Sequence, residues 1–115
     1  MELLRDGADL EEKHEGWTPL MKASEENSVE VLRMLIDKKA NIEATNRKGR
    51  TPLSFAAAPS DDGTKARPTA LQALRLLLES GADAKHKDDR GNTAKDYASR
   101  DKREDALEIF EEFGF

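Results

Sequence analysis

The 115-residue sequence contains no cysteine, one tryptophan, one tyrosine and no long hydrophobic run. Without cysteine there is no disulfide framework, no thiolate metal site and no cysteine nucleophile. The N-terminal residues have no apolar stretch long enough for a signal peptide, and no later stretch is long enough to span a bilayer. We therefore expect a soluble intracellular protein, although the sequence indicates no particular organelle.

Motifs that carry catalysis or bind cofactors are also missing. The phosphate-binding patterns GxxxxGK[ST] and GxGxxG and the nucleophile elbow GxSxG do not occur. His14 and His86 lie in predicted turns without the spacing of a zinc site, so we expect both to be exposed. Carboxylate pairs such as Glu25-Glu26 and Asp88-Asp89 are expected to be solvated on so charged a surface. The sequence predicts no enzyme, no cofactor and no metal site.

Apolar and charged residues each make up 37% of the sequence, which is lean for a globular core. The apolar residues nevertheless cluster in regular blocks, which indicates a thin, elongated fold rather than disorder. The net charge is −5, with 24 acidic and 19 basic residues. General affinity for nucleic acid or anionic membranes is therefore not expected, and a protein partner suits the charge pattern better.

A short motif recurs along the chain. GWTPL at residues 16–20 returns 33 residues later as GRTPL at residues 49–53, and in weakened form as GNTA at residues 91–94. A second motif closes each apolar block, as GAD at residues 7–9, KAN at residues 39–41 and GAD at residues 81–83. Because the two motifs recur in phase over essentially the whole chain, the sequence resembles the ankyrin-repeat family.

Local residue preferences agree with this resemblance. Thr18 and Thr51 each stand before a proline, which is the arrangement of a helix N-cap followed by proline at the first helical position. Residues 29–36 and 71–78 place apolar side chains three and four positions apart, as in helices with one buried face. The resemblance implies an all-α ankyrin-repeat solenoid of stacked helix-turn-helix units joined by β-hairpin-like loops.

We expect a single ankyrin-repeat domain covering residues 1–115. An insertion near residues 58–68 falls between the two helices of one unit, either as a solvated loop or as a recognition element. The N-terminal half unit predicts either a fragment of a longer array or an N-terminal face covered by further repeats or by a partner. The expected units are a partial repeat at 1–15, repeats at 16–48 and 49–90, and a C-terminal capping repeat at 91–115.

The last unit has the features of a terminal repeat. Lys95 and Glu111 stand where earlier units have leucine or isoleucine, so one face of this unit is expected to meet water. Ala98, Leu107 and Phe110 are expected to pack inward, with residues 113–115 folding back on the last helix. Lys39 occupies a helix-end position where other units have glycine, so it is expected to adopt a left-handed conformation at a cost of about 1 kcal/mol.

The resemblance implies a non-catalytic protein-protein interaction module, or an accessory scaffold subunit, that binds a protein partner through a concave face. A regulatory or targeting segment of a longer enzyme chain and a purely structural spacer are the alternatives. Trp17 is the leading contact residue because exposed aromatics are enriched at interfaces, although packing against a neighbouring unit or Pro19 is nearly as well supported. The predicted contact residues are His14, Glu15, Trp17, Lys22, Glu25, Glu26, Arg47, Lys48, Arg50, Phe55, Asp89, Arg90, Asn92, Tyr97, Arg100 and Asp101.

Overall fold

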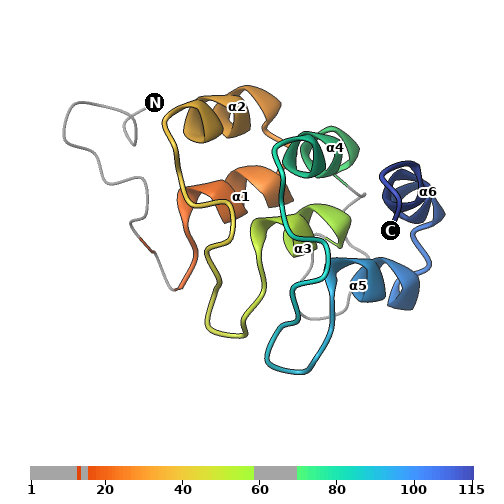
Figure 1. Cartoon of the computed structure of the whole chain (residues 1–115). Coiled ribbons are helices and arrows are strands. Elements are labelled where there is room, and N and C mark those ends of the chain that lie inside the picture. Colours follow the sequence, from red (N-terminus) through yellow and green to blue (C-terminus); the bar gives the residue numbers. More distant parts are fainter. Residues whose placement is uncertain (1–12, 14–15, 59–69) are drawn as a thin grey trace.

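The computed structural model describes residue 13 and residues 16–58 and 70–115, and these contain six α-helices in three consecutive pairs (Figure 1). One helix of each pair lies in a first row formed by α1, α3 and α5, and the other lies in a second row formed by α2, α4 and α6. The predicted all-α ankyrin solenoid is confirmed. The helices are α1 (Pro19–Glu25), α2 (Val29–Asp37), α3 (Pro52–Ala57), α4 (Leu71–Glu79), α5 (Ala94–Arg100) and α6 (Glu104–Glu112).

The three first-row helices begin with the predicted threonine caps. The hydroxyl oxygen of Thr18 accepts the Met21 N–H at 3.3 Å, and the hydroxyl of Thr51 does the same for the N–H three residues later. Thr93 forms a full capping box, because Asp96 returns a carboxylate to the Thr93 N–H at 2.9 Å. Each cap satisfies an amide that has no partner within its helix, so the start of each first-row helix is fixed by local sequence.

Five of the six described helices end in the same left-handed turn. After α4, the N–H of Gly81 donates to the Leu78 carbonyl and the next N–H donates to the Leu77 carbonyl, which is the Schellman arrangement. Lys39 ends α2 in this way at a φ of 71°, so its predicted left-handed conformation is confirmed. Helix α3 ends differently, at the C-cap residue Ala58 with a φ of −145°, which is the first residue of the predicted insertion.

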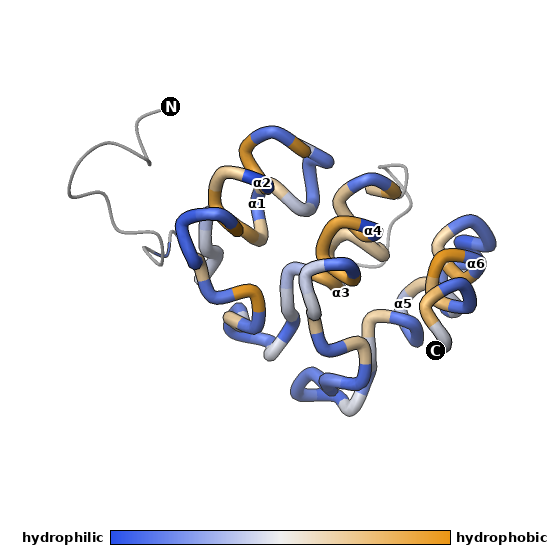
Figure 2. Tube along the Cα trace, turned by 45° about the horizontal axis from the view of Figure 1, so that its top comes forward, coloured by the Kyte–Doolittle hydropathy of each residue, from blue (hydrophilic) through white to orange (hydrophobic). Residues whose placement is uncertain are grey.

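Buried leucines and alanines form one continuous core between the two rows. Leu35 and Leu77 are completely buried, and Phe110 of α6 closes the core at its C-terminal side. The helices of each row contact their neighbours in the preceding and following pairs. Hydrophobic residues accordingly gather in the helices, while the loops between pairs are mostly hydrophilic (Figure 2). Each pair therefore buries its apolar surface against the pairs beside it in sequence.

The C-terminal pair carries the predicted polar substitutions. Glu111 is exposed, and the Lys95 ammonium group donates to the Phe115 carbonyl oxygen at 3.0 Å. Residues 113–115 fold back as expected, since the Phe115 N–H donates to the Phe110 carbonyl oxygen and Phe113 packs against the core. The predicted N-terminal half unit and most of the predicted insertion lie outside the described residues, although α3 and α4 do flank the insertion.

Replacing Lys39 with glycine is expected to raise the free energy of unfolding by up to about 1 kcal/mol, because glycine adopts a φ of 71° without a Cβ clash. The matched control is Lys38→Gly, one residue earlier at a φ of −88°, where glycine only adds backbone entropy and should lower stability. Urea unfolding of both variants measures the difference. A lower stability for Lys39→Gly than for the native chain would contradict this account of the helix end.

Candidate partner-binding face

Two loops project from the helical rows, and we name them finger A (residues 40–50) and finger B (residues 82–92) (Figure 1). In finger A the side-chain oxygen of Asn46 accepts the N–H groups of Lys48 and Arg50, at 3.0 and 2.9 Å. The Asn46 N–H donates in turn to the Arg50 carbonyl oxygen. In finger B, Asp88 closes the turn in the same way, by accepting the N–H groups of Arg90 and Asn92, both at 2.9 Å.

The two fingers are hydrogen-bonded to each other. The Asp89 N–H donates to the Lys48 carbonyl oxygen at 2.9 Å, and a ring nitrogen of His86 lies 3.0 Å from the Gly49 carbonyl oxygen. The prediction of an exposed His86 is therefore wrong, because this contact leaves the ring half-buried. A Cβ on Gly49 would lie 2.7 Å from a carboxylate oxygen of Asp89 and 3.0 Å from its backbone nitrogen, so a side chain at this position would force finger B to shift. They consequently form one surface rather than two independent loops.

Aromatic and arginine side chains stack along the first row of helices. The rings of Trp17 and Phe55 have centroids 4.1 Å apart, at an interplanar angle of 37°. The Arg50 guanidinium lies 4.2 Å from the centre of the Phe55 ring and 4.1 Å from that of the Tyr97 ring. The Arg100 guanidinium lies 4.8 Å from the centre of the same Tyr97 ring. We call these five residues the stack. It joins all three helical pairs through ring contacts and cation–π contacts.

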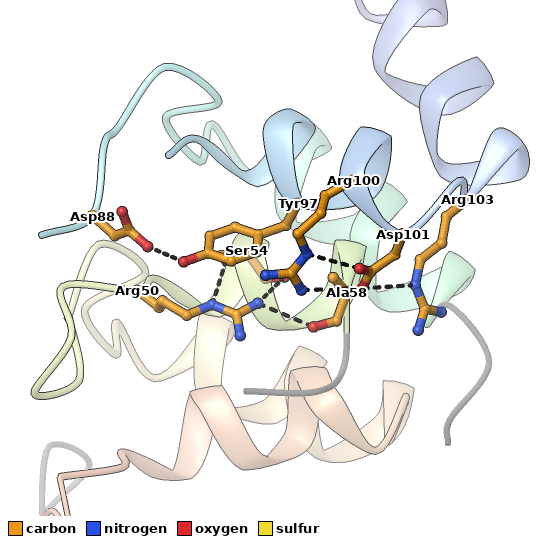
Figure 3. Close-up of polar contacts among 8 residues, drawn as sticks. All are labelled: Arg50, Ser54, Ala58, Asp88, Tyr97, Arg100, Asp101 and Arg103. Atoms are coloured by element: carbon orange, nitrogen blue, oxygen red, sulfur yellow. Dashed lines mark hydrogen bonds and ion pairs between the residues drawn. The ribbon is translucent and has the colours of Figure 1, made fainter. Parts of the chain in front are cut away.

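Arg50 lies at the centre of the stack and is only 1% exposed. Its Nε donates to the Ser54 hydroxyl at 2.8 Å, and a terminal nitrogen donates to the Ser54 and Ala58 carbonyl oxygens, both at 3.0 Å (Figure 3). The Ser54 carbonyl lies in α3 and also accepts the Ala58 N–H at 2.9 Å, and Ala58 is the C-cap residue, so the Arg50 guanidinium braces the C-terminal end of this helix. Arg50, one of the predicted contact residues, is therefore not accessible at the surface in this conformation, because its planar guanidinium lies between two rings and bonds to the end of α3.

Asp88 lies against the stack and is 9% exposed, so the prediction that it would be solvated is also wrong. One carboxylate oxygen closes finger B, and the other accepts the Tyr97 hydroxyl (Figure 3). Burial would raise the pKa of Asp88, but hydrogen bonds from Tyr97 and two backbone amides, together with the Arg50 charge, hold this pKa below its ordinary value. Burial and the same hydrogen bond raise the pKa of Tyr97.

A second polar cluster lies at the end of α5. Asp101 is 4% exposed and accepts two bonds from the Arg100 guanidinium, at 2.8 and 3.3 Å. This hydrogen bond raises the pKa of Arg100, and the Nε of the buried Arg103 lies 3.8 Å from the second oxygen of Asp101. Arg100 thus ends the stack with its cation directed by a buried carboxylate (Figure 3).

The family model of ankyrin repeats in three copies matches residues 1–66, which is more than half of the chain. The chain belongs to the ankyrin-repeat family. It is 39% identical over 95 residues to human ankyrin repeat and SOCS box protein 6, and this match covers 79% of the chain. It is 31% identical over 100 residues to human ankyrin repeat domain-containing protein 63, covering 85% of the chain.

These ankyrin-repeat relatives are much longer than the chain, which spans 22% and 25% of the two human proteins. A third relative, the E3 ubiquitin-protein ligase KEG of Arabidopsis thaliana, is 34% identical over 94 residues, covering 80% of the chain and only 5% of the ligase. In such proteins the repeats are one part of the molecule. No helix in the described ranges of the present chain has the length and apolar character needed to cross a membrane.

Within this ankyrin fold, the predicted contact residues fall into different environments. His14 and Glu15 lie outside the described residues. Phe55, Tyr97 and Asp101 are buried, as Arg50 is, so their side chains are not accessible to a partner in this conformation. Trp17, Glu25 and Asn92 are partly exposed, whereas Lys22, Glu26, Arg47, Lys48, Asp89, Arg90 and Arg100 are exposed.

The close packing of the ankyrin fingers predicts unequal effects at two equivalent glycines. Gly49→Ala and Gly91→Ala both place a Cβ at a positive φ, of 79° and 82°, which costs about 1 kcal/mol. Only the Gly49 variant also meets Asp89, so it should lose a further 1–3 kcal/mol or so, the usual range for overpacking. Thermal or urea unfolding measures both. Equal losses at the two sites would show that finger-to-finger packing is unimportant.

The lowered pKa of Asp88 predicts how stability should depend on pH. The stabilisation is fully present above the ordinary Asp pKa and is lost as pH falls through the lower folded value. Tyr97→Phe keeps the ring in the stack but removes the hydroxyl donor from one oxygen of the buried Asp88 carboxylate, while the other oxygen keeps its two backbone donors. This variant should lose about 1.5–3 kcal/mol at pH 7 and clearly less at pH 3.

Urea unfolding at the two pH values measures the effect, with Ser99→Ala, at an exposed position of α5, as control. The control should show no such pH dependence. Equal losses by Tyr97→Phe at pH 7 and pH 3 would mean that the Asp88 carboxylate does not depend on the tyrosine hydroxyl.

Proposed function

We propose that this chain is a non-catalytic protein-interaction module, or a scaffold subunit, that binds a protein partner through the surface formed by α1, α3, α5 and the fingers. Ankyrin repeats are general protein-interaction modules, which supports the class of function. The choice of surface rests on the resemblance to the family and on the accessible residues of this face. Fold alone does not identify the partner.

The observation that carries the proposal is the stack. Its centre is buried and bonded within the chain, while Trp17 and Arg100 at its two ends remain partly or well exposed. A surface held from beneath in this way loses little conformational entropy when a partner binds. The contact residues we retain are therefore those at the ends of the stack, on the exposed side of α1 and on the fingers. Buried members of the stack act by positioning them.

A second candidate is a regulatory or targeting segment of a longer enzyme chain. Its support is that the curated relatives are much longer than this chain and include one named as a ubiquitin ligase. In that case the repeats would still bind a protein, with catalysis elsewhere. A purely structural spacer has no comparable observation in its favour beyond the repeat itself.

The test is a charge exchange on the first row of helices. The side chains of Lys22 in α1 and of Glu26, the C-cap residue of α1, are 58% and 42% exposed, and the Lys22 Nζ lies 3.7 Å from the Glu26 Oε2. The double variant Lys22→Glu, Glu26→Lys keeps the net charge and the spacing, but reverses the pattern offered to a partner. We expect affinity purification from the source cells to lose specific partners with this variant.

The matched control is Arg33→Glu, Asp37→Arg, which exchanges two exposed charges at the same spacing on α2, in the second row of helices. It should leave the same partners bound, and circular dichroism should show both variants folded. If partners still bind after the α1 exchange but are lost with the α2 exchange, binding lies on the second row of helices and the proposed surface is refuted. A chain that captures no specific partner in any form would favour the spacer.

A further inference from the structure

The fingers carry an excess of positive charge on a chain that is negative overall. Arg47 and Lys48 are exposed at the tip of finger A, whose one acidic residue, Glu43, is half-buried and accepts the Asp83 N–H at 2.9 Å. Finger B exposes Lys85, Lys87 and Arg90 beside Asp83 and Asp89. The third acid of finger B, Asp88, is buried and used internally. The surface of the fingers is therefore basic, although the chain has a net charge of −5.

The opposite sign collects at the C-terminal end. Residues 104–115 contain five acidic residues and no lysine or arginine, and all five acids are exposed on α6. Helix α6 belongs to the second row, away from the fingers (Figure 1). The molecule thus separates its charges, with a basic edge at the fingers and an acidic end at α6.

The basic edge is structurally fixed. The hydrogen bond from the Asp89 N–H to the Lys48 carbonyl holds the two fingertips side by side. The Arg47 side chain lies against Gly16, where a Cβ would come within 2.9 Å of it, so its stem packs on the preceding turn. Because the fingertip backbone is already ordered, less loop entropy is lost when a partner binds than with mobile loops.

We infer that the fingertips bind an acidic peptide segment of a protein partner, with Arg47, Lys48, Lys87 and Arg90 facing its carboxylates. This inference rests on the proposed protein-binding function and adds the chemistry of the partner. Arginine and lysine on a fixed edge pair with carboxylates and speed the encounter by long-range attraction. No aromatic ring of the Phe, Tyr or Trp type occurs in either finger, so base stacking gives a nucleic acid no advantage there.

The experiment measures fluorescence anisotropy of a labelled peptide of six Glu-Ser repeats against the whole chain. The Gln-Ser peptide of equal length is the uncharged control, and thymidine oligonucleotides of equal charge test the alternative ligand class. Arg47→Ala, Arg90→Ala is the test variant. Arg33→Ala, Lys38→Ala removes two exposed positive charges from the α2 region and therefore has the same net charge.

We expect the Glu-Ser peptide to bind, the Gln-Ser peptide not to bind, and affinity to fall steeply from 50 to 200 mM salt. The fingertip variant should bind about fivefold more weakly or worse, while the α2 variant should bind as the native chain does. Equal loss in both variants would overturn the inference, because net charge alone would then explain binding. Tighter binding of the oligonucleotide, or no binding of the Glu-Ser peptide, would overturn it too.

A second copy of the chain is the remaining alternative ligand, since its acidic α6 also offers carboxylates to the basic fingertips. Light scattering at low salt should show a monomer, and an oligomer that the fingertip variant dissociates would overturn the inference in favour of a second copy. The proposed function is judged separately. If the α1 exchange abolishes partner binding but the Glu-Ser peptide does not bind, only the acidic nature of the partner is rejected. If the Glu-Ser peptide binds but the α1 exchange loses no partner, only the proposed surface on α1, α3 and α5 is rejected.

Discussion

The Arg50 guanidinium lies between two aromatic rings and thereby links the three helical pairs on the side where the fingers project. Its ring contacts reach Phe55 in its own pair and Tyr97 in the next, and Phe55 extends the contact to Trp17 in the preceding pair. A buried charge of this kind is costly unless its donors are satisfied, and here they meet the Ser54 hydroxyl and two carbonyl oxygens at the end of α3. The stack is therefore both a contact between repeats and a helix cap.

This arrangement explains how a thin core can support an ordered loop surface. Leucines and alanines bury the interior between the helical rows and reach the fingers only at Ala40, Ala82 and Ala84, while the rest of the fingers is mostly hydrophilic. The fingers are instead ordered by turns closed on Asn46 and Asp88, and by hydrogen bonds from one finger to the next. Asp88 links the two systems, since one of its oxygens closes finger B and the other accepts the Tyr97 hydroxyl of the stack.

The sequence was sufficient to predict the helical pairs, the threonine caps and the left-handed Lys39, because each depends on residues close together in the chain. It was insufficient for the environments of Arg50, His86 and Asp88. A turn position followed by Thr-Pro looks the same whether its side chain points to water or lies between two rings. The partners of these three residues, Tyr97 and Gly49 among them, come from other parts of the chain, and single-sequence patterns do not report such pairings.

Burial of the stack also changes what the finger charges mean. An exposed Arg50 would have added one more cation to the basic edge. Because Arg50 is buried, it adds no charge to the surface, and its charge is instead one of the causes that lower the pKa of the neighbouring Asp88. A charged Asp88 accepts hydrogen bonds from the amides that close finger B, and finger B in turn holds finger A through the Lys48 carbonyl. The position of the exposed cations at the fingertips therefore depends on a cation that no partner can reach.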